Sequence, residues 1–340
     1  MVEILRLAAS GMMHLLNGMR ATRISKNGGP EVLSCEEIAV PEPRADEVAF
    51  RVEAAGVNFI DVYQRTGLYP VPLPATLGGE AAGVVTRVGA NVTGFRVGDR
   101  IASAKVTGAY AEQAVAPVSQ IVRVPDQIEN RIAAALLLQG ATAHYLACDT
   151  FPLKPGDSAL VHAAAGGVGL LLVQIAKRRG ARVLAVVGSE AKVVLAREAG
   201  AEDVVVSTRE NFADAARRFT GGRGVDVVYD SVGKDTFDGS LASLRPRGML
   251  VAFGNASGPI PPFSPLILSQ KGSLYLTRPT LGHYTATIEE LQKRVDDLFG
   301  WVRKGELKVR IGATFPLGNA AEAHRALEGR GTTGKLLLIP

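Results

Sequence analysis

The chain has few of the residues that form disulfides, bind metal through several thiolates or cross a membrane. Its 340 residues include two cysteines, Cys35 and Cys148, and one tryptophan. Two cysteines form neither a disulfide framework nor a multi-thiolate zinc site, and they suit a reducing cytoplasm. No apolar run approaches 18 residues, so we expect no membrane-spanning helix.

Blocks of like charge are also missing. The 38 Lys and Arg residues exceed the 33 Asp and Glu residues and give a formal net charge of +5, but they are scattered along the chain. Nucleic-acid binding is therefore permitted but not indicated. The 47% apolar and 21% charged residues are typical of a globular protein, and the length suggests two domains that each bury a core.

Residues 1–18 differ from the rest of the chain. They are apolar, carry only Glu3 and Arg6 as charged residues, and precede the first regular pattern at Met19. They lack a small-residue cleavage site after a clear hydrophobic core. We interpret them as an extension of uncertain role, with a weak targeting peptide as the alternative.

The remaining chain has two textures. Residues 19–139 contain short alternating runs broken by Gly and Pro, which predict a β-rich, barrel-like domain with bulges. Residues 140–279 alternate strand-forming and helix-forming runs, which predict a doubly wound parallel sheet. A helix over Thr287–Lys304 and a closing strand over Lys335–Ile339 follow, and we assign 280–340 to the first domain.

The most informative stretch is Gly156–Gly169. A β-forming run over Ala159–His162 enters a turn of small residues, and a helix-forming run over Leu170–Lys177 leaves it. Read as the dinucleotide fingerprint GxGxxG, the turn places Ala164, Gly166 and Gly169 at the three marked positions. Gly166 lets the backbone approach a pyrophosphate, Gly169 lets helix and strand pack closely, and the helix N-terminus offers N–H groups.

A second β run over Ala181–Val187 completes a β-α-β unit and ends where such proteins select their cofactor. An acidic residue there favours NAD, and a basic one accommodates the 2′-phosphate of NADP. Ser189 and Lys192 offer a hydroxyl and a cation, whereas Glu190 suits a solvated first-turn acid. Because Lys192 opens the next helix, where a cation opposes the helix dipole unless an anion lies nearby, we favour NADPH over the alternative of a solvated surface lysine.

These motifs carry a family resemblance. Gly156-Asp157, Leu160, Ala164 to Gly167, Gly169, Gln174 and Lys177 fall at the spacings of the quinone oxidoreductase and zeta-crystallin family, within the zinc-independent medium-chain dehydrogenases/reductases. Further matching segments are Ala55–Tyr63, Gly94–Arg100, Val228–Gly233, Phe253–Asn255 and Gly272–Tyr275.

The resemblance implies a GroES-like catalytic domain, a Rossmann cofactor domain, a substrate pocket in the cleft between them, NADPH-dependent reduction of quinones and a homodimer paired through the edge of the cofactor domain. Carried over by position, it places the cofactor against Phe59, Tyr63, Thr142, Tyr145, Gly166, Gly167, Val168, Gly169, Ser189, Lys192, Val232, Asn255, Ala256, Leu281 and Arg330.

The chain departs from the family pattern at one place, and it lacks the metal ligands of the zinc-dependent relatives. Close relatives have a tyrosine near the adenine where this chain has Ser207-Thr208. The zinc-dependent cousins have Cys and His ligands where this chain has Val57-Asn58-Phe59, so we predict no catalytic metal. Hydride must then go to an acceptor that needs little electrophilic help, such as a quinone or an electron-poor alkene.

The predicted catalytic residues are Asn58, Tyr63 and Tyr69. The two tyrosines are candidates to hydrogen-bond the developing oxyanion or to donate a proton, and Asn58 to orient the carboxamide or the substrate oxygen. Tyr69 is equally read as a rim residue that packs a turn. We interpret Asp61 as a turn or capping acid.

Other functions stay open. His162 is read as a buried, hydrogen-bonded structural residue, since no Cys, His or acid cluster accompanies it. An enoyl-thioester or alkenal reductase would use Tyr69 to protonate a carbon. A structural or RNA-binding role resembling that of zeta-crystallin lacks an aromatic and basic stripe here. A cofactor-binding protein without efficient turnover is the third alternative.

Overall fold

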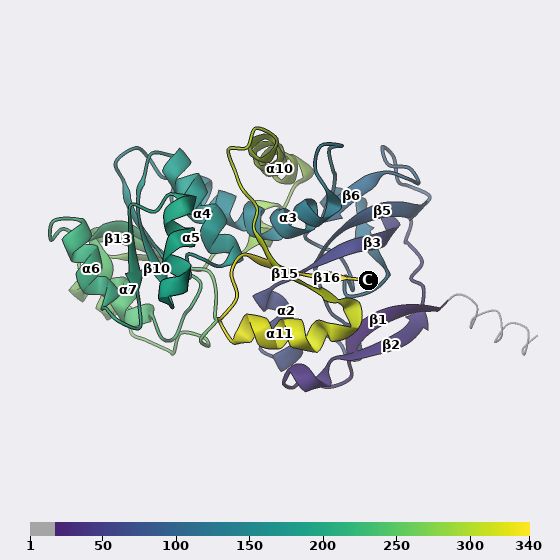
Figure 1. Cartoon of the computed structure of the whole chain (residues 1–340), viewed down its shortest axis with the longest axis horizontal. Helices are drawn as coiled ribbons and strands as arrows, with labels where there is room; N and C mark the ends of the chain where they lie inside the picture. The colour runs from purple at the N-terminus through teal and green to yellow at the C-terminus, as the bar shows by residue number, and fades with distance from the viewer. Residues whose placement is uncertain (1–17) are drawn as a thin grey trace, which may run out of the picture. The chain divides into compact units, whose positions relative to one another are not determined.

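The computed structural model describes residues 18–340, so the predicted extension lies outside the described residues except for Gly18 (Figure 1). These residues form two compact units. Unit 1 contains 18–137, Ala313–Gly329 and Leu336–Pro340, and unit 2 contains Leu138–Gly312 and Arg330–Lys335. No helix within 18–340 is long and apolar enough to span a bilayer.

Unit 1 is built on two β-sheets. The larger has the order β15-β16-β3-β5-β6-β8, with β7 also paired to β3, and the smaller has the order β2-β1-β4. The strands are β1 (Gly18–Ile24), β2 (Ser34–Ala39), β3 (Glu47–Val57), β4 (Ala75–Thr76), β5 (Glu80–Val88), β6 (Arg100–Ser103), β7 (Gln113–Pro117), β8 (Ile121–Arg123), β15 (Ile311–Pro316) and β16 (Lys335–Ile339).

The long strand β3 organises this sheet. It pairs antiparallel with β5, β7 and β16, and Phe50 and Val52 are buried in the main core of the unit. Two register shifts interrupt its pairing with β5, which confirms the prediction of bulges in this region. At Gly83 a Cβ would lie 1.9 Å from the Arg51 carbonyl oxygen, so the two strands approach closely where only glycine fits.

Two helices of unit 1 lie side by side, α2 (Phe59–Thr66) and α11 (Ala320–Glu328) (Figure 1). Asn58 is the N-cap of α2, and the Asp61 carboxylate accepts the Asn58 backbone N–H at 2.8 Å. Gly67 ends the helix with φ +83°, in the left-handed region that glycine adopts readily. The interpretation of Asp61 as a capping acid is therefore confirmed.

Unit 2 contains a six-stranded parallel sheet with the order β11-β10-β9-β12-β13-β14. This is the predicted doubly wound sheet, with the order reversing between β9 and β12. The strands are β9 (Ser158–Val161), β10 (Arg182–Val187), β11 (Asp203–Val206), β12 (Val225–Asp230), β13 (Leu244–Ala252) and β14 (Tyr275–Thr277).

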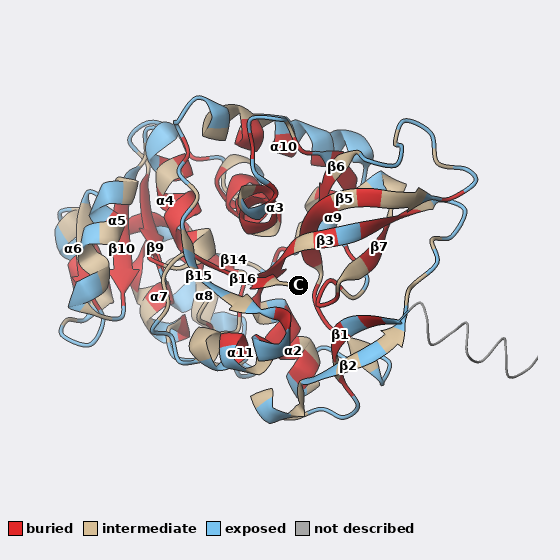
Figure 2. Ribbon diagram, turned by 45° about the vertical axis from the view of Figure 1, so that its right-hand side comes forward, coloured by how far each residue is buried: buried red, intermediate tan, exposed pale blue. Residues whose placement is uncertain are grey.

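Its central strands are apolar because both faces of the sheet are covered. All of β9 and β12 and most of β10 are buried. Figure 2 shows β10 in the red of buried residues. Helix α4 packs on α5, and α6 on α7. The helices are α4 (Gly167–Arg178), α5 (Val193–Ala199), α6 (Phe212–Phe219), α7 (Phe237–Ser243) and α8 (Leu266–Gln270).

Residues 280–312 differ from the predicted division, because they lie in unit 2. This segment contains α9 (Leu281–Tyr284) and α10 (Ile288–Arg303). It packs on the C-terminal half of α3 (Asn130–Tyr145): the Tyr284 ring stacks on Tyr145 with centroids 4.3 Å apart, and Arg294 Nη1 donates to His144 Nδ1 at 3.1 Å. Stacking and a buried hydrogen bond attach the segment to this unit.

Candidate active site

The glycine turn follows β9 and begins α4. Ala163 has φ +47°, Gly166 is the N-cap of α4 and Gly167 its first residue. A Cβ on Gly169 would lie 2.3 Å from the Ala163 carbonyl oxygen and 2.7 Å from Ala164 Cα. No side chain fits against backbone at that distance, so Gly169 permits the close packing of helix and strand that the sequence predicts.

The first turn of α4 is suited to an anion. It carries no acidic residue, and Gly166, Gly167 and Val168 are half-buried. A Cβ on Gly167 would lie 1.8 Å from Gln139 Oε1, so a larger residue there would displace the end of the Gln139 side chain. Unpaired N–H groups and the positive end of the helix dipole favour a phosphate here. Gln139 carried no sequence signal, because its partner lies 28 positions away.

The segment Arg330–Gly334 runs beside this turn. Gly334 forms a parallel bridge with Gly166, and its N–H donates to the Ala165 carbonyl at 3.0 Å. Arg330 has φ +55°, and its Nη2 donates to the Ala256 carbonyl at 3.3 Å. The bridge joins positions 168 residues apart in the chain, so no local pattern announces Gly334.

The predicted 2′-phosphate residues lie after β10. Ser189 precedes a short 3-10 turn, Glu190–Lys192, and Lys192 Nζ donates to the Arg330 carbonyl at 2.5 Å. Burial lowers the pKa of Lys192. Glu190 is exposed and pairs with Arg209 at 2.6 Å, which confirms the reading of a surface acid. A half-buried ammonium bonded to a carbonyl is a site that a phosphate would stabilise.

Three further predicted contacts lie at the ends of neighbouring strands. The Val232 N–H donates to Asp230 Oδ1 at 2.7 Å after β12. After β13, Ala256 N–H donates to the Ser231 carbonyl at 3.2 Å, and the Asn255 amide oxygen accepts from Arg278 Nη2 at 3.0 Å. The structure thus gathers these groups at the carboxyl edge of the sheet, where ligands of doubly wound folds bind.

His162 is a structural residue, as predicted. Its side chain is buried, and Nε2 lies 2.9 Å from Ser240 Oγ, which donates to Asp230 Oδ2 at 2.9 Å. Burial lowers the pKa of the ring. The histidine therefore stabilises the loop after β12 through Ser240 and Asp230.

The remaining predicted contacts of unit 2 lie on helices. Thr142 and Tyr145 are buried on α3, and Leu281 begins α9. Burial raises the pKa of Tyr145, so the phenol keeps its proton. Its stacking partner Tyr284 accepts a hydrogen bond from Thr150 Oγ1 at 3.0 Å, which fixes the aromatic pair.

In unit 1 the structure brings the predicted aromatic residues together. The Phe59 and Tyr63 rings are 6.1 Å apart, and the Tyr63 and Tyr69 rings meet edge to face at 5.2 Å. Tyr63 is buried, whereas Tyr69 is 37% exposed. The Tyr69 N–H donates to the Tyr63 carbonyl at 3.0 Å. These three residues form one aromatic surface that begins at the N-terminus of α2.

Asn58 is more constrained than the sequence suggests. It is buried, and its Nδ2 donates to the Gly56 carbonyl at 3.2 Å and to Glu80 Oε2 at 2.9 Å. Both amide hydrogens are thus used within unit 1. The Glu80 carboxylate, itself fully buried, fixes the orientation of the amide and was not among the predicted residues.

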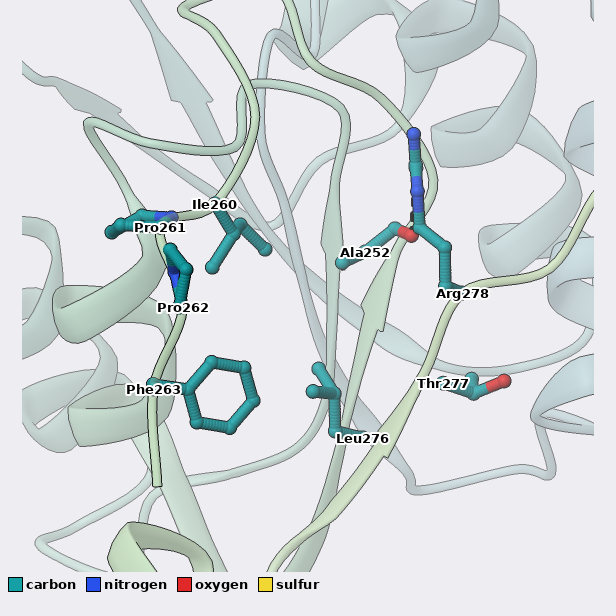
Figure 3. Close-up of a pocket in the computed structure, with 8 residues that line it drawn as sticks. All are labelled: Ala252, Ile260, Pro261, Pro262, Phe263, Leu276, Thr277 and Arg278. Carbon is teal, nitrogen blue, oxygen red and sulfur yellow. Dashed lines mark hydrogen bonds between the residues drawn. The ribbon is translucent and has the colours of Figure 1, made fainter. Parts of the chain in front are cut away.

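A cavity of about 400 Å³ lies in unit 2 where β13 and β14 end. Ile260, the two following prolines and Phe263 face Leu276 and Ala252 across it, with Arg278 at one side (Figure 3). The hollow is mostly apolar and largely open to solvent. In the described part of the chain, no three His, Cys, Asp or Glu side chains are grouped to hold a metal.

Comparison with known proteins agrees with this geometry. Residues 44–126 match the family profile described as alcohol dehydrogenase GroES-like domain, and 167–298 the one described as zinc-binding dehydrogenase. A quinone oxidoreductase of Pseudomonas aeruginosa is 49% identical over 315 residues, which cover 92% of this chain and 97% of that protein. A 2-haloacrylate reductase of a Burkholderia species is 42% identical, covering 94% and 98%.

Solved structures give the same relationship. The quinone oxidoreductase of Escherichia coli, solved as a complex with NADPH, superposes with a TM-score of 0.93 at 43% identity and covers 94% of this chain and 100% of its own. Sequence matches along nearly the whole described chain and a shared fold agree. The chain therefore belongs to the quinone oxidoreductase family of the medium-chain dehydrogenases/reductases.

Proposed function

We propose that this protein is an NADPH-dependent quinone reductase. The observation that carries the proposal is the carboxyl edge of the unit 2 sheet, where a glycine turn at a helix N-terminus and a half-buried lysine occupy the two places that a dinucleotide phosphate needs. The quinone oxidoreductases with which the chain shares up to 49% identity support the acceptor class.

The residues present fit NADPH. The backbone N–H groups of Gly167 and Val168 would hold the pyrophosphate. Gly166, whose own N–H donates to the Ala163 carbonyl at 2.8 Å, would let it approach the backbone. Ser189 and Lys192 would hold the 2′-phosphate, with Arg330 beside them. A bound phosphate would give Lys192 Nζ a charged acceptor in place of the Arg330 carbonyl. Its negative charge would offset the free energy that is lost when the ammonium is buried.

When bound, NADPH supplies the hydride. The aromatic surface of Phe59, Tyr63 and Tyr69 would stack a flat acceptor and exclude water. A phenolic hydroxyl of Tyr63 or Tyr69 would hydrogen-bond the oxygen on which negative charge develops. Asn58 would orient the nicotinamide carboxamide through its amide oxygen, because Gly56 and Glu80 hold both of its amide hydrogens. A quinone accepts hydride with little electrophilic help, so position and water exclusion carry the reaction.

The test is the anaerobic rate of NADPH oxidation with a 1,4-quinone, an ortho-quinone and a trans-2-enoyl thioester, each repeated with NADH. We expect fast turnover of a quinone with NADPH and little with NADH. Turnover of the thioester alone would assign the chain to the double-bond reductases, and Tyr69→Phe would then be the next variant to measure.

Two further predictions belong to the proposal. A homodimer would pair through β14, the edge strand of the parallel sheet, whose Tyr275 is 58% exposed. Sedimentation of the wild type beside a Leu276→Pro variant would test it, because proline disrupts edge pairing. A cytoplasmic location follows from the low cysteine content, and cell fractionation would check it.

A further inference from the structure

A chain of buried hydrogen bonds crosses unit 1 between α11 and α2. Arg65 Nη1 lies 3.1 Å from His324 Nδ1, His324 Nε2 lies 3.1 Å from Tyr110 Oη, and Tyr110 Oη donates to Asp61 Oδ2 at 2.9 Å. The same Asp61 oxygen accepts the Asn58 backbone N–H at 2.8 Å. Each of the four side chains from Arg65 to Asp61 is at most 1% exposed.

The hydrogen bonds from Arg65 to Asp61 run in a single direction. A guanidinium only donates hydrogen bonds, so His324 Nδ1 must accept from Arg65, and the ring proton then lies on Nε2. That N–H donates to the Tyr110 oxygen, which leaves the Tyr110 hydroxyl to donate to Asp61. Asp61 accepts from two donors and is therefore the acceptor end. No member can reverse without breaking a buried hydrogen bond.

The outer end of this chain is held as firmly. Arg65 forms a two-point ion pair with Glu328, at 2.9 Å and 2.7 Å, and its Nε donates to the Gly28 carbonyl at 3.1 Å. The guanidinium thus joins the last turn of α2 to the last residue of α11. Its position leaves the His324 ring one orientation.

The hydrogen-bonded side chains from Arg65 to Asp61 keep their protons and do not pass them from one to the next. Burial and the Arg65 charge lower the pKa of His324 to about 3, and burial together with the Asp61 charge raises the pKa of Tyr110 well above its usual value. A relay needs groups that exchange protons near the working pH. His324 and Tyr110 do not exchange protons near that pH, so the series of hydrogen bonds holds its side chains in fixed positions.

The series of hydrogen bonds ends at the residues that we propose to contact the quinone. Asn58 is the N-cap of α2, and Phe59 and Tyr63 lie in its first turns. The amide of Asn58 is oriented from the other side by Glu80, at 2.9 Å. The backbone of Asn58 is thus fixed by Asp61 and its side chain by Glu80.

We propose that His324 and Tyr110 are positioning residues for the reductase reaction, which hold Asn58 and the aromatic surface in place through Asp61. This inference rests on the proposed function. It assigns a role in turnover to α11, a helix near the C-terminus that carries none of the predicted contact residues.

The first test removes one hydroxyl. Tyr110→Phe breaks the series of hydrogen bonds at its centre. We expect kcat for quinone reduction to fall about tenfold, since misplaced groups lower the rate. The KM for NADPH should change less than about twofold, because the glycine turn and Lys192, which would hold its phosphates, belong to unit 2. Tyr229→Phe is the matched control, because it removes a buried hydroxyl in unit 2 that donates to the Leu146 and Phe151 carbonyls. The control should lose stability and keep kcat.

The second test uses rescue. His324→Leu should lower kcat as Tyr110→Phe does, and His324→Gln, whose amide both accepts and donates, should recover part of the loss. Wild-type kcat in Tyr110→Phe, or equal losses in the Leu and Gln variants, would overturn the positioning role. A wild-type protein without quinone turnover would instead overturn the proposed function and the role that rests on it.

The third readout does not use activity. Long-range proton–nitrogen spectra of 15N-histidine protein should show the His324 ring as the neutral Nε2–H form from pH 5 to 8, assigned by its loss in His324→Gln. A proton on Nδ1, or a ring that titrates near its usual pKa of about 6.5, would contradict the proposed order of hydrogen bonds from Arg65 to Asp61.

Discussion

The polar groups around α2 in unit 1 and at the sheet edge of unit 2 are arranged in opposite ways. Around α2, Asp61, Tyr110, His324 and Arg65 are buried and joined in series by hydrogen bonds. At the sheet edge of unit 2, Lys192 is half-buried, Arg330 is exposed, and both are bonded to backbone carbonyls. The closed arrangement fixes geometry, whereas the open one leaves charged donors for a ligand. Each arrangement makes a different kind of substitution harmful.

The largest effect should follow from closing the backbone turn of unit 2. A Gly169→Val side chain would overlap the Ala163 and Ala164 backbone, so we expect NADPH binding to be lost and the free energy of unfolding to fall by about 1–3 kcal/mol. Fluorescence titration with NADPH and urea unfolding would measure both. Gly300→Ala, where a Cβ meets nothing within 4 Å, should bind NADPH as the wild type does.

Next in size is the ion pair of unit 1 between buried Arg65 and half-buried Glu328. Arg65→Leu leaves Glu328 and His324 without their donor, and we expect a loss of about 1–3 kcal/mol in the free energy of unfolding. Arg182→Leu is the contrasting variant, because its pair with Glu202 is nearly half exposed and should cost about 0–1 kcal/mol. Similar urea midpoints for the two variants would remove the distinction between closed and open arrangements.

A smaller effect should appear at Lys192 and only with one cofactor. Lys192→Ala should weaken NADPH binding about tenfold, the value of one charge-assisted hydrogen bond, and leave NADH binding unchanged. Only the protonated amine binds phosphate, so wild-type NADPH affinity should fall as the pH rises through the lysine pKa, which burial lowers. Equal losses for both cofactors would contradict the 2′-phosphate assignment.

The effect that is smallest at neutral pH concerns acid stability. His324 stays neutral in the folded protein down to about pH 3, whereas the unfolded ring binds a proton below about pH 6.5. The contribution of His324 to the free energy of unfolding is therefore complete above pH 6.5. This contribution is lost as the pH falls toward 3, by about 1.4 kcal/mol per pH unit. Urea midpoints between pH 7 and 5 should fall less steeply in His324→Gln. The exposed His283→Gln should keep the wild-type slope.

Local features of the molecule could be predicted from the sequence. The β9, turn and α4 order, the alternation of strands and helices over 140–279, and the structural role of His162 all depend on neighbours within a few positions or on the 2.0 and 3.6 periods. The helix over 287–304 was also predicted, and α10 covers Ile288–Arg303. An amphipathic helix shows which face is apolar but not which core receives it, so its unit was not predictable.

Features that join distant positions were out of reach. Asp61 was recognised as a cap, but its bond to Tyr110 spans 49 positions and the step from Tyr110 to His324 spans 214. The bridge between Gly166 and Gly334 is equally remote. Arg330 entered only through the family resemblance. Side chains that meet through the tertiary fold leave no periodicity, so a single sequence gives no sign of them.

The pairing of β16 with β3 has a consequence for how the chain folds as it leaves the ribosome. β3 precedes unit 2 in the chain, whereas the strand that covers its edge, Lys335–Ile339, follows the stretch Leu138–Gly312 of unit 2. A nascent chain thus displays an open strand edge, a site of misassembly, until Lys335–Ile339 has emerged. The sheet of unit 1 is therefore completed only after most of unit 2 has been made.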